Sequence, residues 1–217
     1  MTLDALDASA RKVGLAVRGA FHPSSEDDAP ESAQTLVMLG PDEPRFWGIF
    51  STSSEYLDGR PHPLDRWSKR ATASLAVPLG GTAVFPYDGP PYAPFLNWAQ
   101  RSSACWSSPV GLLVHDTAGL FISFRAALAL PQRLDLPAPA ISPCPTCEDR
   151  PCESACPVGA LAPGKDYDVP TCVARMQSID GAACREGCLV RRACPVSKSF
   201  GRLPEQSAFH MRAFLGE

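Results

Sequence analysis

The chain has 217 residues, of which 45% are hydrophobic and 20% are charged, so it can form a folded core and extensive disorder is excluded. Its formal net charge of −3 provides no general attraction to nucleic acid or to an anionic membrane, and neither is expected as a partner. The N-terminal segment 1–21 contains acids and no continuous apolar run, which predicts neither a secretory signal nor a membrane span. Nine cysteines without an export signal indicate a reducing compartment, so we expect a cytoplasmic, metal-binding protein.

The first hundred residues predict alternating helices and strands. Apolar residues at helical spacing or helix-compatible composition predict helices at three places: 3–14, 64–77 and 95–104. Short β-rich runs predict strands at three places: 15–21, 35–40 and 81–86. The segment 87–94 is expected to be a loop because four of its eight residues are Gly or Pro.

The next part of the chain predicts a hairpin and then a domain boundary. The runs VGLLVH and LFISFRAALAL are β-rich and are separated by a four-residue turn at 116–119, which predicts a β-hairpin. The segment 131–143 contains four prolines and no periodicity, so it is expected to be a semi-rigid connector. We therefore expect an α+β protein with one domain over 1–137 and a second over 138–217, which ends in a helix over 205–215.

Eight of the nine cysteines lie after this connector, in two groups that both end in Cys-Pro. The first group has the spacing C-x2-C-x4-C-x3-C-P, and its members are Cys144, Cys147, Cys152 and Cys156. The second group is spaced more loosely, and its members are Cys172, Cys184, Cys188 and Cys194. Thiolates are soft ligands that select zinc, copper(I) or iron–sulfur clusters. The Cys-Pro endings favour iron–sulfur clusters, with two structural zinc sites as the alternative.

The paired motifs resemble those of two-cluster bacterial ferredoxins, and the first motif is similar to runs in multi-cluster electron-transfer subunits of molybdenum oxidoreductases. In a ferredoxin-type pair, the fourth cysteine of each motif binds the cluster of the other motif. The resemblance thus implies one [4Fe–4S] cluster on Cys144, Cys147, Cys152 and Cys194. It implies a second [4Fe–4S] cluster on Cys156, Cys172, Cys184 and Cys188. Clusters that only stabilise a small domain are the alternative to clusters that carry electrons.

The segment CWSSPVGLLVHDTAGLFISFRAALALPQRLDLPAP (105–139) resembles the corresponding region of epoxyqueuosine reductases and of the cobalamin-processing decyanase family. In epoxyqueuosine reductases and reductive dehalogenases, this type of domain is followed directly by a two-cluster ferredoxin module, as the order of parts is here. The resemblance implies a nitroreductase-like α/β sandwich domain that binds a corrinoid (cobalamin), followed by a small ferredoxin-like domain. A flavin, FMN, is the alternative cofactor.

The same resemblance implies roles for residues outside the two motifs. Asp88 lies where the related reductases carry a D-S-A-P loop, which implies a proton donor with a pKa raised by burial, whereas an ordinary Asp-Gly turn is the alternative. Cys105 and His115 are candidate cofactor contacts, with a small buried residue and a turn cap as their respective alternatives. The lysine of the reductases' GWIGK element is missing from CWSSP (105–109), and tRNA-binding repeats are absent, so no tRNA substrate is expected.

Three functions are compatible with these features. The first is a cobalamin-dependent oxidoreductase, in which a flavodoxin-like or ferredoxin-reductase-like donor reduces the clusters and the clusters reduce a corrinoid that acts on a small molecule. The second is a ferredoxin-like electron carrier or corrinoid-handling protein without turnover of its own. The third is a binding module with structural metal only. We favour the enzyme and leave the other two open. A basic run that could dock an acidic donor, or that could simply be solvated, comprises Arg185, Arg191, Arg192, Lys198 and Arg202.

Overall fold

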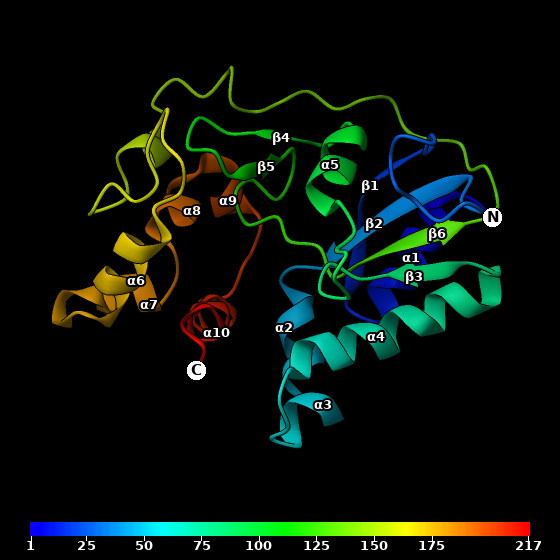
Figure 1. Cartoon of the computed structure of the whole chain (residues 1–217), viewed down its shortest axis with the longest axis horizontal. Helices are drawn as coiled ribbons and strands as arrows, with labels where there is room; N and C mark the ends of the chain where they lie inside the picture. Colours follow the sequence, from blue (N-terminus) through cyan, green and yellow to red (C-terminus); the bar gives the residue numbers. More distant parts are fainter. The chain divides into compact units, whose positions relative to one another are not determined.

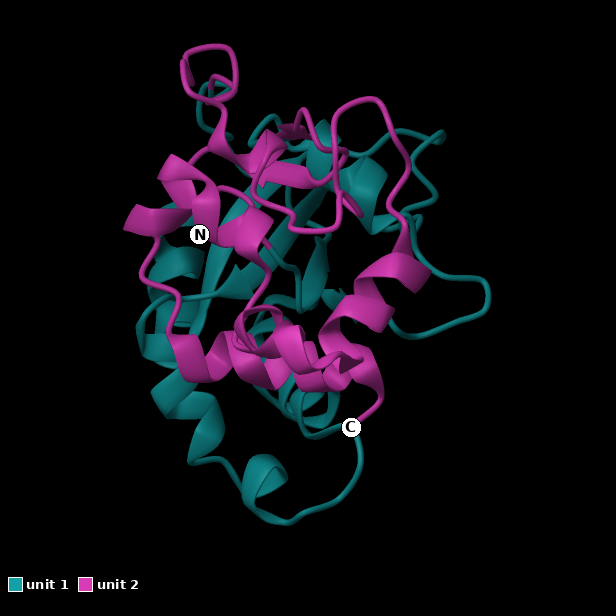
Figure 2. Ribbon diagram, turned by 90° about the vertical axis from the view of Figure 1, so that its left-hand side faces the viewer, with its two compact units in different colours: residues 1–105, 123–140 teal, residues 106–122, 141–217 magenta.

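The computed structural model describes residues 1–217, which divide into two compact units (Figure 2). The first unit comprises residues 1–105 and 123–140, and the second comprises residues 106–122 and 141–217. The secondary structure is mixed, with a small antiparallel sheet, so the expected α+β class is confirmed. The contacts assign the segment 106–122 to the second unit, whereas the boundary expected from the sequence left it in the first.

The first unit is built on a four-stranded antiparallel sheet with the order β1-β2-β6-β3 (Figure 1). Its strands are β1 (Leu15–Phe21), β2 (Thr35–Pro41), β3 (Thr82–Val84) and β6 (Ala126–Leu130). Every residue of β2 and β6 is buried. Since side chains alternate between the two faces of a strand, both faces of the sheet are covered at its centre. The three strands expected in the first hundred residues are confirmed, with the third shortened.

The first unit also contains helices, three of which contact the sheet at several residues. The helices are α1 (Leu3–Lys12), α2 (Arg45–Ser51), α3 (Ser54–Leu57), α4 (Pro63–Ala76), the 3₁₀ helix η1 (Val77–Leu79) and α5 (Phe95–Arg101). Helix α1 contacts β1, and α4 contacts both β3 and β6. Helix α4 begins with Pro63, at a position where a missing N–H group costs little. The three helices expected in this region are confirmed, and each ends one to three residues earlier than expected.

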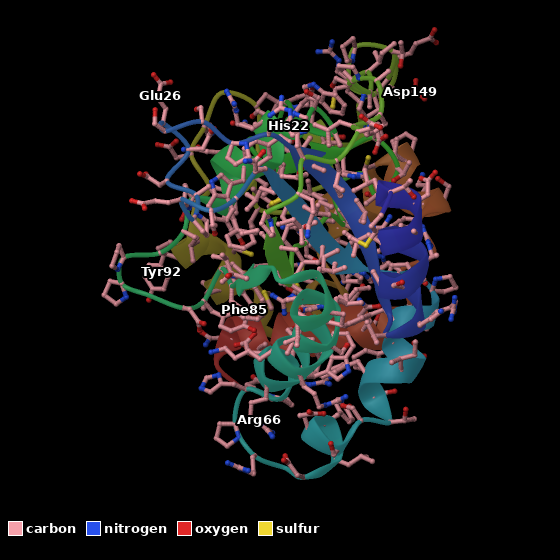
Figure 3. The ribbon with its side chains drawn as sticks, turned by 90° about the vertical axis from the view of Figure 1, so that its right-hand side faces the viewer. His22, Glu26, Arg66, Phe85, Tyr92 and Asp149 are labelled. Carbon is pink, nitrogen blue, oxygen red and sulfur yellow. The ribbon has the colours of Figure 1, made fainter.

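Charged side chains fix α3 to α4 at one end of the first unit. Arg66 of α4, labelled in Figure 3, donates to Asp58 with both terminal nitrogens, each at 2.7 Å. Arg70 donates to the two carboxylate oxygens of Glu55 at 2.5 and 2.9 Å. The hydrogen bonds from Arg70 lower the pKa of Glu55 to about 2. Glu55 is therefore held as a carboxylate throughout the neutral range.

The second unit consists of short helices, turns and a two-stranded sheet. Its elements are β4 (Cys105–Ser107), β5 (Leu113–His115), η2 (Pro151–Glu153), α6 (Val169–Gln177), η3 (Ile179–Gly181), α7 (Ala182–Arg185), α8 (Leu189–Ala193), α9 (Pro195–Ser199) and α10 (Pro204–Leu215). Helix α10 confirms the terminal helix expected over 205–215. A small core joins the segment 106–122 to the rest of this unit, and its buried members are Val110, Val114, Leu120, Cys152, Leu161, Val190 and Cys194.

The prediction of a β-hairpin around the turn at 116–119 is wrong. The turn is present, since the backbone N–H of His115 donates to Gly119 O at 3.1 Å. The strand before it, β5, pairs with β4, however, and the second run forms a strand only from Ala126 onward. That strand, β6, pairs with β2 and β3 in the sheet of the first unit.

Side chains from the C-terminal region explain why the second run does not begin as a strand. The N–H group of Leu120 donates to Ser197 Oγ at 2.8 Å, and the guanidinium of Arg191 donates to Leu120 O. Arg202 donates to Phe121 O at 3.1 Å, and its guanidinium lies 5.2 Å from the centre of the Phe121 ring. These backbone groups are thus satisfied by side chains and are not free to form a ladder. Arg191 and Arg202 consequently bind their own chain, which corrects the interpretation of the whole basic run as a solvated face.

Candidate metal centres

Four cysteines from the two motifs lie within electrostatic reach of one another in the second unit: Cys144, Cys147, Cys152 and Cys194. Burial, followed by the charges of Cys194 and Cys147, raises the pKa of the Cys144 thiol. Burial, followed by the charges of the other three thiols, raises the pKa of Cys152. We call these four residues the first thiol set. They are the same four residues that the ferredoxin resemblance implies for one cluster.

A cavity of about 370 Å³ is lined by all four members of the first thiol set. Apolar side chains form much of its wall, including Val114, Leu120 and Val196. Two of the thiols, Cys152 and Cys194, are only 8% exposed. Asp149, labelled in Figure 3, belongs to the charged stretch 148–150 that also lines the cavity. The donor set and the cavity therefore fit a group that binds four thiolates in largely apolar surroundings.

The remaining four cysteines of the motifs form a second thiol set: Cys156, Cys172, Cys184 and Cys188. Burial raises the pKa of Cys172, and the charges of Cys188 and Cys156 act in the same direction. Burial also raises the pKa of Cys184, against the nearby positive charge of Arg175, and the other three thiols raise it further. None of the resolved interactions between thiols joins the second set to the first.

Short helices position the thiols of both sets. Cys172 lies in α6, whose N-terminus is capped by Asp168 Oδ1 accepting from Thr171 N at 3.0 Å. Cys194 lies between α8 and α9 with an extended backbone (φ −58°, ψ 125°). Pro195 disfavours a helical conformation at Cys194 and begins α9 at no hydrogen-bond cost. The Cys-Pro pair thus ends α8 where Cys194 reaches the cavity of the first set.

The chemistry of these thiols is constrained in three ways. No disulfide joins any of the nine cysteines. No three His, Cys, Asp or Glu side chains are close enough together to hold a single metal ion. Partial burial raises the pKa of two thiols in each set, which makes thiolates costly there, so a group that binds them as thiolates must bring positive charge of its own.

Two groups lie near the second thiol set: Tyr167, which was not identified from the sequence, and Arg191, which was named there as part of the basic run. The hydroxyl of Tyr167 is hydrogen-bonded to Cys172, and burial raises its pKa above the ordinary value. The guanidinium of Arg191 lies within electrostatic reach of both Cys188 and Tyr167, although burial lowers its pKa. Tyr167 belongs to no recognisable motif, so only the folded chain reveals its hydrogen bond with Cys172. Arg191 lies within the second motif, between Cys188 and Cys194.

The wall of the first cavity also includes residues that the cysteine spacing does not indicate. Ser108, Pro109, Val114 and Leu120 all line it and come from the segment 106–122. This segment lies more than twenty residues before the first motif, and it was expected to belong to the other domain. Its contribution to the second unit could not be inferred from local patterns.

Asp88 lies on the loop between β3 and α5, which Figure 3 marks by Tyr92. Its side chain is 49% exposed, and its carboxylate lies 2.7 Å from Lys69 Nζ. A proton donor of the expected kind relies on burial to keep the carboxyl protonated. Asp88 lacks this burial in the structure, and its role as a proton donor stays a prediction.

His115 and Cys105 are both buried, with 4% and 1% of their surface exposed. The Nδ1 atom of His115 accepts from the backbone N–H groups of Thr117 and Ala118, both at 3.1 Å. These hydrogen bonds cap the turn at 116–119. Cys105 lies in β4. A role for either residue in binding a cofactor stays a prediction.

Helices of the chain are all too short or too polar to cross a membrane. In comparisons with known proteins, no family model matches the chain, and neither a curated protein sequence nor a solved structure matches it significantly.

Proposed function

We propose that the chain is an iron–sulfur electron-transfer protein whose second unit carries two [4Fe–4S] clusters. The observation that carries this proposal is the grouping of the eight thiols into two sets of four. Each set combines the first three cysteines of one motif with the last cysteine of the other. Crossed sets of this kind are a feature of two-cluster ferredoxins.

The residues around the two thiol sets support an electron-transfer role. The clusters supply one-electron chemistry at potentials set by charge, hydrogen bonding and exposure. Val114, Leu120 and Val196 keep the first set in apolar surroundings. Arg175 and Arg191 place positive charge close to the second set.

The two sets must also lie close to each other. Cys152 and Cys156 belong to different sets but are separated by only four positions in the chain. Four residues span at most about 14 Å when fully extended. A short separation favours the passage of electrons from one cluster to the other.

Metal analysis tests the proposal directly. The protein is purified without oxygen, and iron, zinc and acid-labile sulfide are measured per chain. About eight irons with matching sulfide are expected for two four-iron clusters. About two zinc ions without sulfide would identify structural zinc sites. Fewer than about two irons would overturn the iron–sulfur proposal.

For the first unit we propose a nitroreductase-like fold in which a corrinoid, or alternatively FMN, receives the electrons. The support is the resemblance of segment 105–139 to epoxyqueuosine reductases, together with the antiparallel sheet and its helices. Hydroxocobalamin and FMN are added separately to the purified protein while the visible spectrum is recorded. A shift with one of them identifies the cofactor, and no shift with either would reject this proposal.

A carrier without turnover of its own is the second proposed function. The observation that favours it is the half-exposed Asp88, which is paired with Lys69 instead of being buried as a proton donor. In both functions an external redox protein of the flavodoxin or ferredoxin-reductase type supplies electrons. The exposed basic residues Arg192 and Lys198 suit an acidic donor. That no disulfide joins the nine cysteines supports the cytoplasm as the compartment.

A further inference from the structure

Ser108 is a buried polar residue in the wall of the cavity that the first thiol set lines. It is 6% exposed, and its Oγ atom is buried without a hydrogen-bond partner. Its backbone groups are satisfied, because its N–H donates to Leu112 O at 2.8 Å and its C=O accepts from Gly111 N at 3.0 Å. Leaving a buried hydroxyl unsatisfied destabilises the folded protein, because nothing compensates the loss of its hydrogen bonds to water. A hydroxyl in this position is therefore expected to bond to something that occupies the cavity.

Three other polar side chains that line the cavity or lie next to a lining residue already have partners. The hydroxyl of Thr146 donates to Pro143 O at 3.2 Å. The guanidinium of Arg150 lies 3.7 Å from the carboxylate of Glu153. The hydroxyl of Ser142 is hydrogen-bonded to Cys144. Ser108 thus differs from these neighbours in having a buried donor without an acceptor.

The segment that carries Ser108 is fixed to the second unit at several points. Val110, Val114 and Leu120 belong to the same apolar core as Cys152 and Cys194. The backbone of Leu120 is held by Ser197 and Arg191. These contacts hold the serine at the cavity wall before any group binds, which is what a defined hydrogen bond to a cluster requires.

We propose that Ser108 Oγ donates a hydrogen bond to a sulfur of the cluster held by the first thiol set and thereby raises the reduction potential of that cluster. This inference rests on the proposed iron–sulfur function. Sulfur atoms of the cluster or of its cysteine ligands supply the acceptor that the hydroxyl lacks. Reduction adds negative charge to these sulfurs, so the hydrogen bond stabilises the reduced form more than the oxidised form.

Removal of the hydroxyl should make reduction of the first cluster harder. We expect the ratio of reduced to oxidised cluster at a fixed potential to fall about tenfold, which equals about 59 mV for a one-electron couple. The second cluster should keep its potential, because its thiols are not among the residues that line this cavity.

The test compares four variants with the wild-type full chain, all purified without oxygen. Ser108→Ala and Ser108→Gly lack the hydroxyl, Ser108→Thr retains it, and Ser107→Ala removes a neighbouring exposed hydroxyl. Iron is counted, and the midpoint potential of each cluster is measured by redox titration followed by electron paramagnetic resonance. The signal that disappears in Cys144→Ala identifies the first cluster.

The proposal is supported if the reduction potential of the first cluster falls in Ser108→Ala or Ser108→Gly. The potential should keep its wild-type value in Ser108→Thr and Ser107→Ala. Iron loss confined to both variants that lack the hydroxyl supports the proposal too, since no protein group accepts from this hydroxyl. Unchanged potentials with about eight irons in every variant would overturn the role of Ser108 and leave the clusters standing. Wild-type protein without iron would overturn both proposals.

Discussion

Cys194 closes the second motif, yet it lies among the thiols of the first. If it is a ligand there, Cys194→Ala should remove the same cluster as Cys144→Ala. The iron content should fall from about eight to about four per chain, because one four-iron cluster is lost. Iron analysis and the electron paramagnetic resonance spectrum of the reduced protein measure this outcome.

Cys156 provides the reciprocal comparison, since it closes the first motif but lies among the thiols of the second. Cys156→Ala should therefore lose the same cluster as Cys172→Ala. Cys105→Ala is the control, because this ninth thiol lies in β4 outside both sets and its removal should leave the iron content unchanged. Loss of one and the same signal from Cys194→Ala and Cys172→Ala would contradict the crossed grouping.

Glu55 provides a prediction about charge in the first unit. Hydrogen bonds from Arg70 lower its pKa from 4.5 to about 2, so its ionised form stabilises the folded state. This contribution is fully present above about pH 5 and is lost as the pH falls towards about 2. Because the Arg70 side chain is 59% exposed, we expect Glu55→Gln to cost only about 1 kcal/mol at pH 7.

Amide hydrogen exchange of α4 in wild type and Glu55→Gln measures this difference. The gap between the two proteins should be largest near neutral pH and should narrow by about pH 3, where the unfolded chain is already protonated. Glu31→Gln, at an exposed position, should match wild type throughout. A gap that does not change with pH would show that the effect is not ionic.

At the scale of elements, the turn at 116–119 is held against the start of α9. Gly119 has a φ of +57°, and a Cβ atom there would lie 2.5 Å from Ser197 N. Gly111 has a φ of +75°, but a Cβ atom there would have no neighbour within 4 Å. Each Gly→Ala change should lower the free energy of unfolding by about 1–2 kcal/mol because the backbone there is left-handed. Gly119→Ala should lower it by about 1–3 kcal/mol more because its Cβ atom clashes with Ser197.

Thermal unfolding of the iron-loaded protein compares these two variants, with iron release as a second signal. Gly119→Ala should have the lower midpoint and should lose iron earlier, because displacement of Ser197 also loosens Leu120 in the cavity wall. Equal unfolding midpoints for the two variants would mean that the close contact between residue 119 and Ser197 does not affect stability.

Patterns along the chain predict the elements whose own residues form a regular apolar pattern. The alternating run 15–21 and the apolar run 35–40 form strands β1 and β2 where expected. The hairpin prediction is wrong because contacts distant in sequence decide the backbone of Leu120. Its partners Arg191 and Ser197 lie 71 and 77 residues further along the chain. Periodicity within a short window contains no information about such partners.

The candidate metal centres, too, are only partly predictable from the sequence. Cysteine spacing indicates thiolate ligands, because the types and order of ligands are written in the sequence. The cavity wall is not predictable in this way. Ser107 and Ser108 are chemically identical neighbours, but one is exposed and the other is buried beside the thiols. Only the packing of the segment 106–122 distinguishes them.

On the scale of the whole molecule, the two units differ in what their cores contain. In the first unit, aliphatic residues of the central strands, such as Leu36, Met38 and Leu128, are completely buried. In the second unit, Cys152 and Cys194 are themselves members of a small core. Where metal ligands occupy core positions, metal binding and folding are coupled. Loss of metal should therefore affect the two units unequally.

Anaerobic removal of iron with a chelator, followed by amide hydrogen exchange, measures this inequality. Protection of α6 and α8 should fall by about 100-fold or more, because α6 contains Cys172 and α8 lies between Cys188 and Cys194. Protection of β2 and β6 should change by less than about threefold, because their burial involves no thiol.

Reconstitution with iron and sulfide is the control and should restore the original protection of α6 and α8. Equal loss of protection in both units would show that the chain unfolds as one cooperative body. It would contradict the view that the two cores are stabilised separately. Unchanged protection in α6 and α8 would show that packing alone orders the second unit. Loss confined to the second unit would mean that its shape depends on the group its thiols bind, while the sheet of the first unit folds without that group.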